Sequence, residues 1–218
     1  MNVKYDSEYL KNTLYSGILC DVMDQMGHRN QSLGASFKMN SDKQVLLGKA
    51  FTSIGTEVYT MPENPLTAQC KVIDQMSEDE VYILSTRGHY NCAIFGELLA
   101  TAIQAKKGVG AVIDGCARDL KRLREIEFPL FFKGALPTTS KGRCEVTECQ
   151  VPIIIDSVMI YPGDIVFGDI DGVAIIPSAI ADEVFEEALK IVLKEDTVRE
   201  SLLDGAKLLD TYAKIGAI

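Results

Sequence analysis

Apolar and polar positions alternate along the middle of the chain with two different periods. Apolar runs of strand length occur at 80–86 (EVYILST), 109–114 (VGAVID) and 129–134 (PLFFKG). Segments with the spacing of amphipathic helices stand at 64–76 (NPLTAQCKVIDQM), 96–108 (GELLATAIQAKKG) and 118–126 (RDLKRLREI). Strands and helices that alternate at this distance are typical of βαβ units with parallel strands. The pattern predicts an α/β layer in the middle of the chain.

The segments around this layer carry weaker signals. Two helices are expected over SEYLKNTLYSG and ILCDVMDQMG, ending at Gly17 and Gly27, because glycine often follows the last helical residue. The β-rich stretch LLGKAFTSIGTEVYTM indicates a pair of strands at about 46–60. The stretch RGHYNCAIF at 87–95 is expected to form a loop.

The last third of the chain changes character. Residues 151–176 are rich in β-branched side chains and contain the turn sequences PGD and DIDG, which predicts a set of short strands. Ser178 is expected to cap a long helix over 179–196, and a final helix is expected at about 197–214. Neither an internal repeat nor a linker is visible in the sequence. Residues 1–218 are therefore expected to form a single domain, with C-terminal helices from about 178 that make subunit contacts.

Composition and charge narrow the functional classes. The chain carries a net charge of −9 at pH 7, and its densest basic stretch, KRLR at 121–124, is followed by Glu125 and Glu127. Nucleic-acid-binding proteins usually show a basic stripe, so no nucleic-acid partner is expected. The first residues lack the apolar core of a signal peptide, and no apolar run approaches the roughly 18 residues that span a bilayer. We expect a soluble, cytoplasmic protein with no membrane partner.

The cysteines and histidines do not indicate zinc. The six cysteines include no C-x-x-C pair, and the chain has two histidines, His28 and His89. A zinc site needs closely spaced cysteine and histidine ligands. The thiols are expected to be reduced and mostly buried, although Cys116 stands beside charged residues and is a candidate reactive thiol.

Charged residues gather at two strand-to-helix junctions. One junction is Gly96-Glu97-Leu98-Leu99, and the other ends in Arg118-Asp119. In parallel α/β folds such junctions share one edge of the sheet, where ligands bind. Helix N-termini and an arginine fork both hold carboxylate or phosphate groups, and nearby acids suggest Mg²⁺ or Mn²⁺ with several water ligands. Alternatively, Glu97 and Asp119 only occupy helix first turns, where the helix dipole favours acids.

Other acids have candidate structural roles. Asp114 ends a predicted strand and either braces Arg118 or forms a turn. Asp164, Asp169 and Asp171 stand in the sequences PGD and DIDG, where aspartate typically hydrogen-bonds its own backbone. We expect turn formation from these three.

The long C-terminal helix carries one more candidate. Val184, Ala188 and Ile191 are spaced as an apolar stripe, which reaches Glu195 four residues later. Glu195 either ends in water or faces a partner surface or a polar site. Asp196 continues the neighbouring stripe, so the choice between the two acids stays open at this point.

Three blocks of the sequence resemble a known family. The blocks GELLATAIQAKKGVGAVIDGCARD, FPLFFKG and YPGDIVFGDIDGVAIIP follow one another in order. They are similar to the RraA-like family, which contains 4-hydroxy-4-methyl-2-oxoglutarate aldolase and regulator of ribonuclease E activity A. The resemblance runs from about Ser16 to Glu195. It implies an α/β fold of the αββα sandwich type, assembled as a homotrimer or as a homohexamer of two trimers.

The resemblance also implies a function, that of a class II pyruvate aldolase acting on a 4-hydroxy-2-oxo acid. The backbone N–H groups of Gly96, Glu97, Leu98 and Leu99 would hold the pyruvyl carboxylate. Arg118 would bind the keto or carboxylate oxygens of the substrate. Retro-aldol cleavage and decarboxylation of oxaloacetate leave the same pyruvate enolate, so one site would serve both reactions.

A divalent cation, Mg²⁺ or Mn²⁺, belongs to this implied mechanism. Asp119 would ligate the metal directly, and Glu97 would act through water. A glutamate from the C-terminal helix of the neighbouring subunit would help to hold the metal waters, and Glu195 is the best-placed candidate. The site would then lie at a subunit interface.

The chain departs from the family pattern just before the first junction. It has Gly88-His89 where the family often has Gly-Asp, and Phe95 where the family often has tryptophan. His89 is either a loop residue or part of the pocket. Three functions remain: an aldolase with decarboxylase activity, a related lyase acting on a sugar-acid derivative, and a non-catalytic regulator that binds ribonuclease E. Asp119, which the regulators tend to lack, favours an enzyme.

Overall fold

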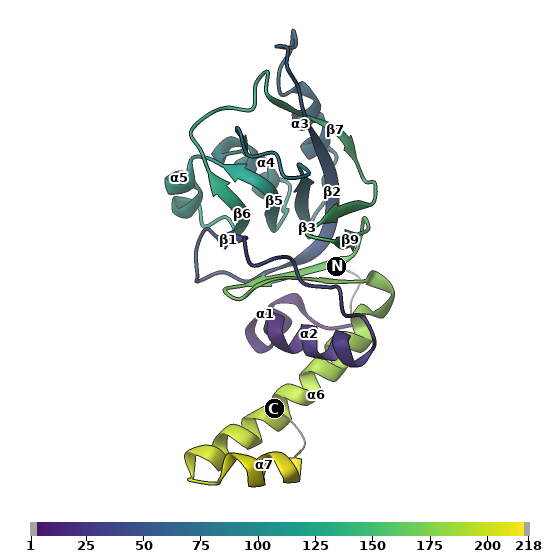
Figure 1. Cartoon of the computed structure of the whole chain (residues 1–218), viewed down its shortest axis with the longest axis vertical. Helices are drawn as coiled ribbons and strands as arrows, with labels where there is room; N and C mark the ends of the chain where they lie inside the picture. The colour runs from purple at the N-terminus through teal and green to yellow at the C-terminus, as the bar shows by residue number, and fades with distance from the viewer. Residues whose placement is uncertain (1–3, 216–218) are drawn as a thin grey trace.

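The computed structural model describes residues 4–215 and shows an α/β protein (Figure 1). Its helices are α1 (Ser7–Thr13), α2 (Ser16–Gln25), α3 (Thr67–Asp74), α4 (Glu97–Ala105), α5 (Leu120–Glu125), α6 (Ala181–Leu203) and α7 (Leu208–Ile215). Its strands are β1 (Lys38–Met39), β2 (Leu46–Glu57), β3 (Glu80–Ser85), β4 (Ala93–Phe95), β5 (Gly110–Ala117), β6 (Leu130–Ala135), β7 (Cys144–Cys149), β8 (Ile153–Ile155), β9 (Val158–Ile160), β10 (Ile165–Asp169) and β11 (Gly172–Ile176). Within residues 4–215, no helix combines the length and the apolarity that a membrane span requires.

The predicted parallel layer is confirmed. Strands β2, β3, β5 and β6 pair in parallel in that order, with α3, α4 and α5 in the connections between them. β1 adds an antiparallel strand beside β6, and β10 adds one beside β2. The short strands expected at 151–176 are also present, since β10 pairs with β11 and β8 pairs with β9 in a separate hairpin.

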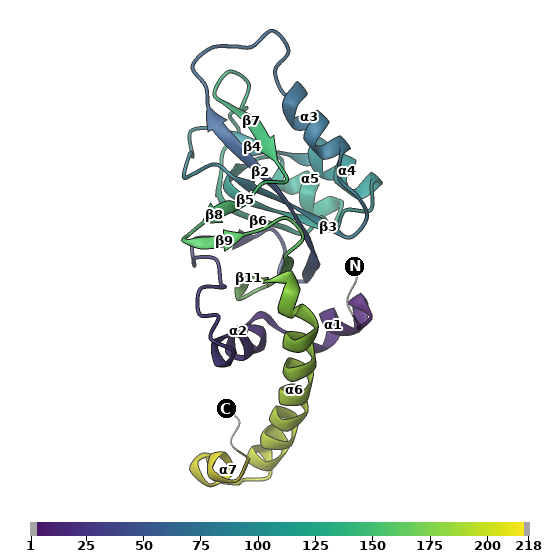
Figure 2. The same ribbon diagram turned by 90° about the vertical axis from the view of Figure 1, so that its right-hand side faces the viewer.

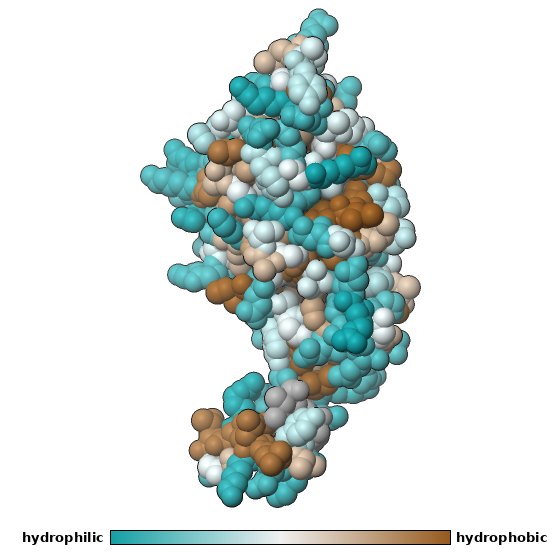
Figure 3. Space-filling model, viewed as in Figure 1, coloured by the Kyte–Doolittle hydropathy of each residue, from teal (hydrophilic) through white to brown (hydrophobic). Residues whose placement is uncertain are grey.

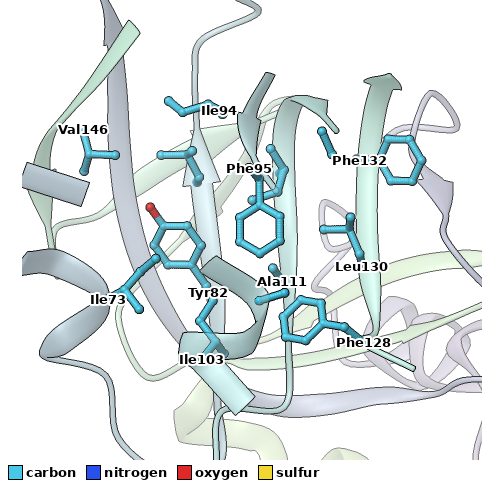
Figure 4. Close-up of a cluster of buried hydrophobic side chains, with 14 of the residues drawn as sticks. Ile73, Tyr82, Ile94, Phe95, Ile103, Ala111, Phe128, Leu130, Phe132 and Val146 are labelled. Carbon is cyan, nitrogen blue, oxygen red and sulfur yellow. The ribbon is translucent and has the colours of Figure 1, made fainter. Parts of the chain in front are cut away.

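Three buried apolar clusters separate four layers. The first lies between α3, α4 and α5 and one face of the parallel strands, and it contains Tyr82 (Figure 4). The second lies between β10 and β11 and the helices α1, α2 and α6. The third lies on the inner face of the sheet and contains Val81, the neighbour of Tyr82 in β3. Adjacent residues of β3 thus face different clusters, as strand geometry requires, and the layers form the expected αββα sandwich.

The stretch at 46–60 forms one long strand, so the expected strand pair is wrong. β2 is 12 residues long. It pairs with β10 and β3 along its first part and with β7 from Ser53 onward, and the pairing with β7 contains a register shift between Ile54 and Gly55. A Cβ on Gly55 would lie 3.1 Å from Ile94 Cδ1. Gly55 therefore permits close packing inside a bent strand and does not end the strand.

Two expectations for the N-terminal half need correction. Gly17 lies inside α2 and ends no helix, whereas Gly27, with a φ of 88°, follows the end of α2 as expected. The predicted loop at 87–95 contains the short strand β4, which pairs in parallel with β5. The backbone groups of residues 93–95 find hydrogen-bond partners in β5, which the local sequence does not reveal.

The C-terminal helices also differ from the prediction. Ser178 does not cap α6: it begins a 3₁₀ turn at Ser178–Ile180, and its N–H donates to Asp164 Oδ1 at 3.1 Å. α6 continues past the expected boundary to Leu203. Gly205, with a φ of 90°, separates α6 from α7, so the helix expected at 197–214 is the end of α6 followed by a separate short helix.

Candidate functional site

Two neighbouring strand ends bring the two predicted junctions together. β4 ends at Phe95 and β5 ends at Ala117, and these residues pair in the sheet. The Arg118 N–H donates to the Phe95 carbonyl oxygen at 2.9 Å. A Cβ on Gly96 would lie 2.7 Å from Asp119 Oδ2. Glycine at this position therefore lets the start of α4 approach the Asp119 carboxylate.

Phe95 anchors this corner in the core. Its ring centroid lies 6.2 Å from that of Tyr82 and 5.8 Å from that of Phe128, and Figure 4 shows the three rings in a row. All three side chains are fully buried. Aromatic packing of this kind contributes beyond the burial of area. The residue directly before Gly96 is thus fixed, and the N-terminus of α4 is fixed with it.

Asp119 keeps its carboxylate available for a ligand. It precedes α5 in the left-handed conformation, with a φ of 60°, which costs energy for a residue other than glycine. In the described part of the chain, its side chain caps no N–H group of α5. The side chain is 44% exposed, and Oδ2 lies 3.5 Å from Arg118 Nε. The Asp119 carboxylate is therefore half-exposed, with Arg118 as its neighbour, and can take up a ligand from the solvent side.

The N-terminus of α4 supplies donors for an anion. Gly96 is the N-cap residue and has no side chain with which to cap the first N–H groups. Free N–H groups and the positive end of the helix dipole favour a carboxylate or phosphate. The donors belong to Glu97, Leu98 and Leu99. The Glu97 carboxylate itself accepts a hydrogen bond from Thr101 Oγ1 at 2.9 Å, so it lies along the helix.

A pocket of about 180 Å³ adjoins this corner. It lies between β4, the start of α4, the β5–α5 junction and α3, which stands next to α4 (Figure 2). Arg118 and Asp119 line this pocket, and they also line a second hollow of about 310 Å³ that extends to Pro137. Both charged side chains are therefore open to ligands from two sides.

The donor set at Asp119 fits a divalent cation that keeps most of its water. Among the described residues, no three or more His, Cys, Asp or Glu side chains gather as a metal site. One half-exposed carboxylate is nevertheless a suitable ligand for Mg²⁺, which is commonly held by one or two carboxylates and several waters. Asp119 could hold such an ion, and a second carboxylate would have to come from outside this corner.

A model of one protein family matches most of the chain. This model, described as RraA-like (Aldolase/RraA), covers residues 17–175. The chain belongs to the RraA-like family. It is 28% identical over 212 residues to protein DlpA of Legionella pneumophila, a match that covers 93% of this chain and 34% of DlpA. The chain thus spans about a third of the length of that relative.

Other members of the RraA-like family carry names of two kinds. The 4-hydroxy-4-methyl-2-oxoglutarate aldolase of Thermus thermophilus is 30% identical over 109 residues, which cover 49% of this chain and 65% of that protein. The crystal structure of Streptomyces coelicolor RraAS2, described as an unusual member of the RNase ES inhibitor RraA protein family, matches with a TM-score of 0.77 at 26% identity. That match covers 89% of this chain and 97% of RraAS2. Family membership alone does not choose between enzyme and inhibitor.

Within one chain, Glu195 does not join the corner. α6, which carries it, extends away from α4 and α5 (Figures 1 and 2). The Tyr15 hydroxyl donates to Glu195, and burial together with this carboxylate raises the pKa of Tyr15. Asp196 pairs instead with Arg199. Glu195 could therefore act on a metal only at the site of a neighbouring subunit.

Asp114 does not brace Arg118, so that interpretation is wrong. Its Oδ1 lies 2.9 Å from Lys133 Nζ, and the two side chains are only 6% and 8% exposed. Lys133 also lies 2.5 Å from Asp156 Oδ1. Burial lowers the pKa of Lys133, but its hydrogen bonds to the two carboxylates raise the pKa more, and the net pKa lies above its ordinary value. Lys133 could not be predicted as a buried partner, because the sequence PLFFKG does not show that its lysine is buried.

The loop before β4 lies outside the pocket lining. His89 Nδ1 stands 3.6 Å from Glu57 Oε1, and its Nε2 stands 3.7 Å from Cys92 Sγ. The pocket is lined by other residues, so the structure favours the interpretation of His89 as a loop residue. Burial raises the pKa of the Cys116 thiol, which argues against a reactive cysteine there.

The expected turn chemistry is confirmed for two aspartates. Asp164 Oδ2 accepts the Tyr161 N–H at 2.9 Å, and Asp169 Oδ1 accepts the Asp171 N–H at 3.0 Å. Asp169 also accepts the N–H and the hydroxyl of Ser16 at 2.7 and 2.6 Å. This acid thus fixes the β10–β11 turn to the start of α2.

Proposed function

We propose that this protein is a divalent-metal-dependent aldolase that cleaves a 4-hydroxy-2-oxo acid and releases pyruvate. The observation that carries the proposal is the close approach of Gly96 to the Asp119 carboxylate, with Arg118 beside it. The N-terminus of α4, the guanidinium of Arg118 and the half-exposed carboxylate of Asp119 are then neighbours. The aldolase name of the Thermus thermophilus relative supports this choice.

Each residue of the corner has a role in this proposal. The N–H groups of Glu97, Leu98 and Leu99 bind the substrate carboxylate at the positive end of α4. Arg118 binds the keto oxygen and orients the substrate, because its planar fork fixes direction as well as charge. Asp119 holds Mg²⁺ or Mn²⁺, and Glu97 acts on it through water. The bound cation would supply Lewis-acid stabilisation of the negative charge that develops on the substrate oxygen.

The same corner supports a second reaction, the decarboxylation of oxaloacetate. Both reactions leave negative charge on the keto oxygen of a pyruvate enolate. Arg118 stabilises that charge in either case. We therefore expect one site to release pyruvate from oxaloacetate as well as from a 4-hydroxy-2-oxo acid such as 4-hydroxy-4-methyl-2-oxoglutarate.

The proposal includes a homotrimer or homohexamer with sites between subunits. Glu195 from the C-terminal helix of one subunit would then help to hold the metal waters beside Asp119 of the next. The C-terminal helices are suited to contacts between subunits, because Figure 3 shows an apolar surface at their end of the molecule. In these helices Leu203, Leu208 and Leu209 are 82%, 57% and 77% exposed. Sedimentation or light scattering of the wild-type protein tests this part.

The match to RraAS2 supports a second candidate, a non-catalytic regulator that binds ribonuclease E. This function needs neither the Asp119 carboxylate nor a metal. Binding of ribonuclease E that survives Asp119→Ala, in a protein without turnover, would favour the regulator. A lyase acting on a sugar-acid derivative would use the same corner and would differ only in substrate.

The test of the proposed function is pyruvate release from oxaloacetate and from 4-hydroxy-4-methyl-2-oxoglutarate. The wild-type oligomer is assayed with Mg²⁺, with Mn²⁺ and with excess chelator. We expect release with metal and its loss on chelation. A folded oligomer that releases pyruvate from no 2-oxo acid under any of these conditions contradicts the proposal.

A further inference from the structure

A large hollow lies at the opposite edge of the sheet from Arg118 and Asp119. It has a volume of about 900 Å³, and it is bounded by α1, by the loop 40–45 between β1 and β2, by the end of α5 and by the start of β6. The strands β2 and β6 begin at this edge, whereas the corner follows the carboxyl end of β5. A molecule bound in the hollow would therefore not meet the substrate.

The loop 40–45 leaves three buried side-chain atoms without a hydrogen-bond partner among the described residues. These atoms are Asn40 Oδ1, Asn40 Nδ2 and Gln44 Oε1, and both residues line the hollow. Asn40 is only 3% exposed. Buried polar atoms almost always have a partner, so each exception calls for an explanation. Because no hydrogen bond within residues 4–215 holds the Asn40 amide group, this group can turn toward a ligand without losing one.

The main chain of Asn40 anchors a guanidinium beside this amide. Arg124 Nε donates to the Asn40 carbonyl oxygen at 3.0 Å, and Arg124 also lines the hollow. In the part of the chain that the structure describes, its two terminal nitrogens, Nη1 and Nη2, have no partner. The anchored side chain thus keeps two donors for an anion, and a carboxylate matches this geometry.

Exposed charges of both signs surround the amide and the guanidinium. Asp42, Lys43 and Glu127 line the hollow, and in the described chain none of these three side chains has a hydrogen bond or an ion pair. By contrast, Lys11 and Glu8 on α1 pair with each other at 2.7 Å. Water and salt screen exposed charges, so selection of a ligand depends mainly on the buried amide and the anchored guanidinium.

We infer that this hollow binds a free α-amino acid with an uncharged side chain. The carboxylate of the ligand accepts from Arg124 and from Asn40 Nδ2. Its ammonium group donates to the side-chain oxygens of Asn40 and Gln44 and lies near the carboxylates of Asp42 and Glu127. The head group thus uses the unpaired charges of both signs, and the remaining lining includes the apolar side chains of Met39, Val45 and Pro129. The inference does not depend on the proposed aldolase function, because no residue of the corner takes part.

The first experiment measures thermal unfolding of the wild-type oligomer with added ligands. The probes are L-glutamine and L-leucine, and the matched controls are N-acetyl-L-glutamine, which lacks the ammonium group, and L-glutaminamide, which lacks the carboxylate. At about 10 mM, we expect at least one of the two amino acids to raise the midpoint by about 3 °C or more, as a Kd of about 1 mM or below requires. A smaller shift with both amino acids, or an equal shift with either control, overturns the inference.

A matched pair of arginines on α5 tests the location of the site. Arg124→Gln removes the guanidinium beside Asn40. Arg122→Gln removes one that pairs with Glu125 at 2.8 Å and is not among the described residues that line the hollow. In calorimetric titration with the more strongly stabilising amino acid, we expect affinity to fall about tenfold or more in Arg124→Gln and to stay unchanged in Arg122→Gln. Equal affinity in the two variants overturns the assignment of the ligand to this hollow.

A further variant tests the buried amide. Asn40→Leu replaces the amide with an apolar group of similar shape, so it removes two unpaired polar atoms and the contacts proposed for the ligand. We expect affinity for the amino acid to fall about tenfold or more, while the unfolding midpoint of the ligand-free protein stays at or above that of the wild type. Wild-type affinity in a folded Asn40→Leu protein overturns the role of the amide in binding.

Discussion

Asp114 and Asp119 stand five residues apart at the end of one strand, yet their surroundings are opposite. Asp114 is 6% exposed and pairs with Lys133, which pairs in turn with Asp156. Asp119 is 44% exposed, has a left-handed backbone conformation and caps no helix in the described residues. The buried acid has its partners and supports the fold. The open acid has only the neighbouring Arg118 beside its carboxylate, at 3.5 Å, and this difference is why the proposed function uses Asp119 as the metal ligand.

The largest expected effect comes from removing the open acid. Asp119→Ala should lower pyruvate release by at least about 10³-fold, equivalent to about 4 kcal/mol in the activation free energy. Thermal unfolding should remain near that of the wild type, since the lost side chain is half-exposed and caps no N–H group of α5 in the described chain. A folded Asp119→Ala protein with wild-type turnover would remove Asp119 from the site.

Removing the partner of the buried acid should act on stability. Lys133→Met leaves the Asp114 and Asp156 carboxylates close together without their cation, which should lower the free energy of unfolding by about 3 kcal/mol. Denaturant unfolding measures this loss. The control is Lys190→Met, because Lys190 pairs with Glu187 at the surface, where ion pairs contribute little. An unchanged unfolding midpoint in Lys133→Met would show that the buried cluster is not a structural element.

The close approach at Gly96 should be sensitive to one methyl group. Gly96→Ala places a Cβ 2.7 Å from Asp119 Oδ2 and must displace that carboxylate. Misplacement of a catalytic group by about 1 Å can cost about 100-fold in rate, and we expect a loss of that order in kcat. Gly17→Ala is the control, because its Cβ would meet nothing closer than 3.6 Å. Wild-type kcat in Gly96→Ala would contradict the geometry proposed for the site.

The smallest expected effect is a pH dependence of the buried pair. The pKa of Lys133 is higher in the folded protein than its ordinary value, because its carboxylate partners outweigh burial. Its contribution to stability is therefore complete below about pH 10 and is lost as the pH rises through the folded pKa. The difference in free energy of unfolding between wild type and Lys133→Met should be constant from about pH 7 to 9 and should shrink above about pH 10.5. A difference that grows with pH would contradict the assigned pairing.

The corner could be predicted from the sequence because the local pattern marks both strand-to-helix junctions. The run VGAVID is followed by the charged start of one helix, and Gly96 precedes Glu97 at the start of the helix before that run. Both junctions could therefore be placed on one sheet edge. The partner of Asp114 could not be predicted in the same way. β5 and β6 pair with a register shift between Ile113 and Cys116, and sequence alone does not reveal which lysine such a shift brings to a buried aspartate.

Other differences have equally local causes. Gly55 lies inside β2, where the register with β7 shifts but the strand continues. The short strand β4 is formed by parallel pairing with β5. The end of α6 is set by Gly205 rather than by the acids at 195 and 196. In each case a tertiary contact or a single backbone conformation overrides the pattern of side chains.

The central claim, that Asp119 holds a divalent cation, is tested most directly by metal binding without turnover. Mn²⁺ is titrated calorimetrically into the wild-type oligomer and into Asp119→Asn, which keeps the side-chain shape and removes the charge. We expect one Mn²⁺ per subunit for the wild type and a loss of affinity of about 100-fold or more in Asp119→Asn. Equal Mn²⁺ affinity in the two proteins, both folded and in the same oligomeric state, would contradict the account.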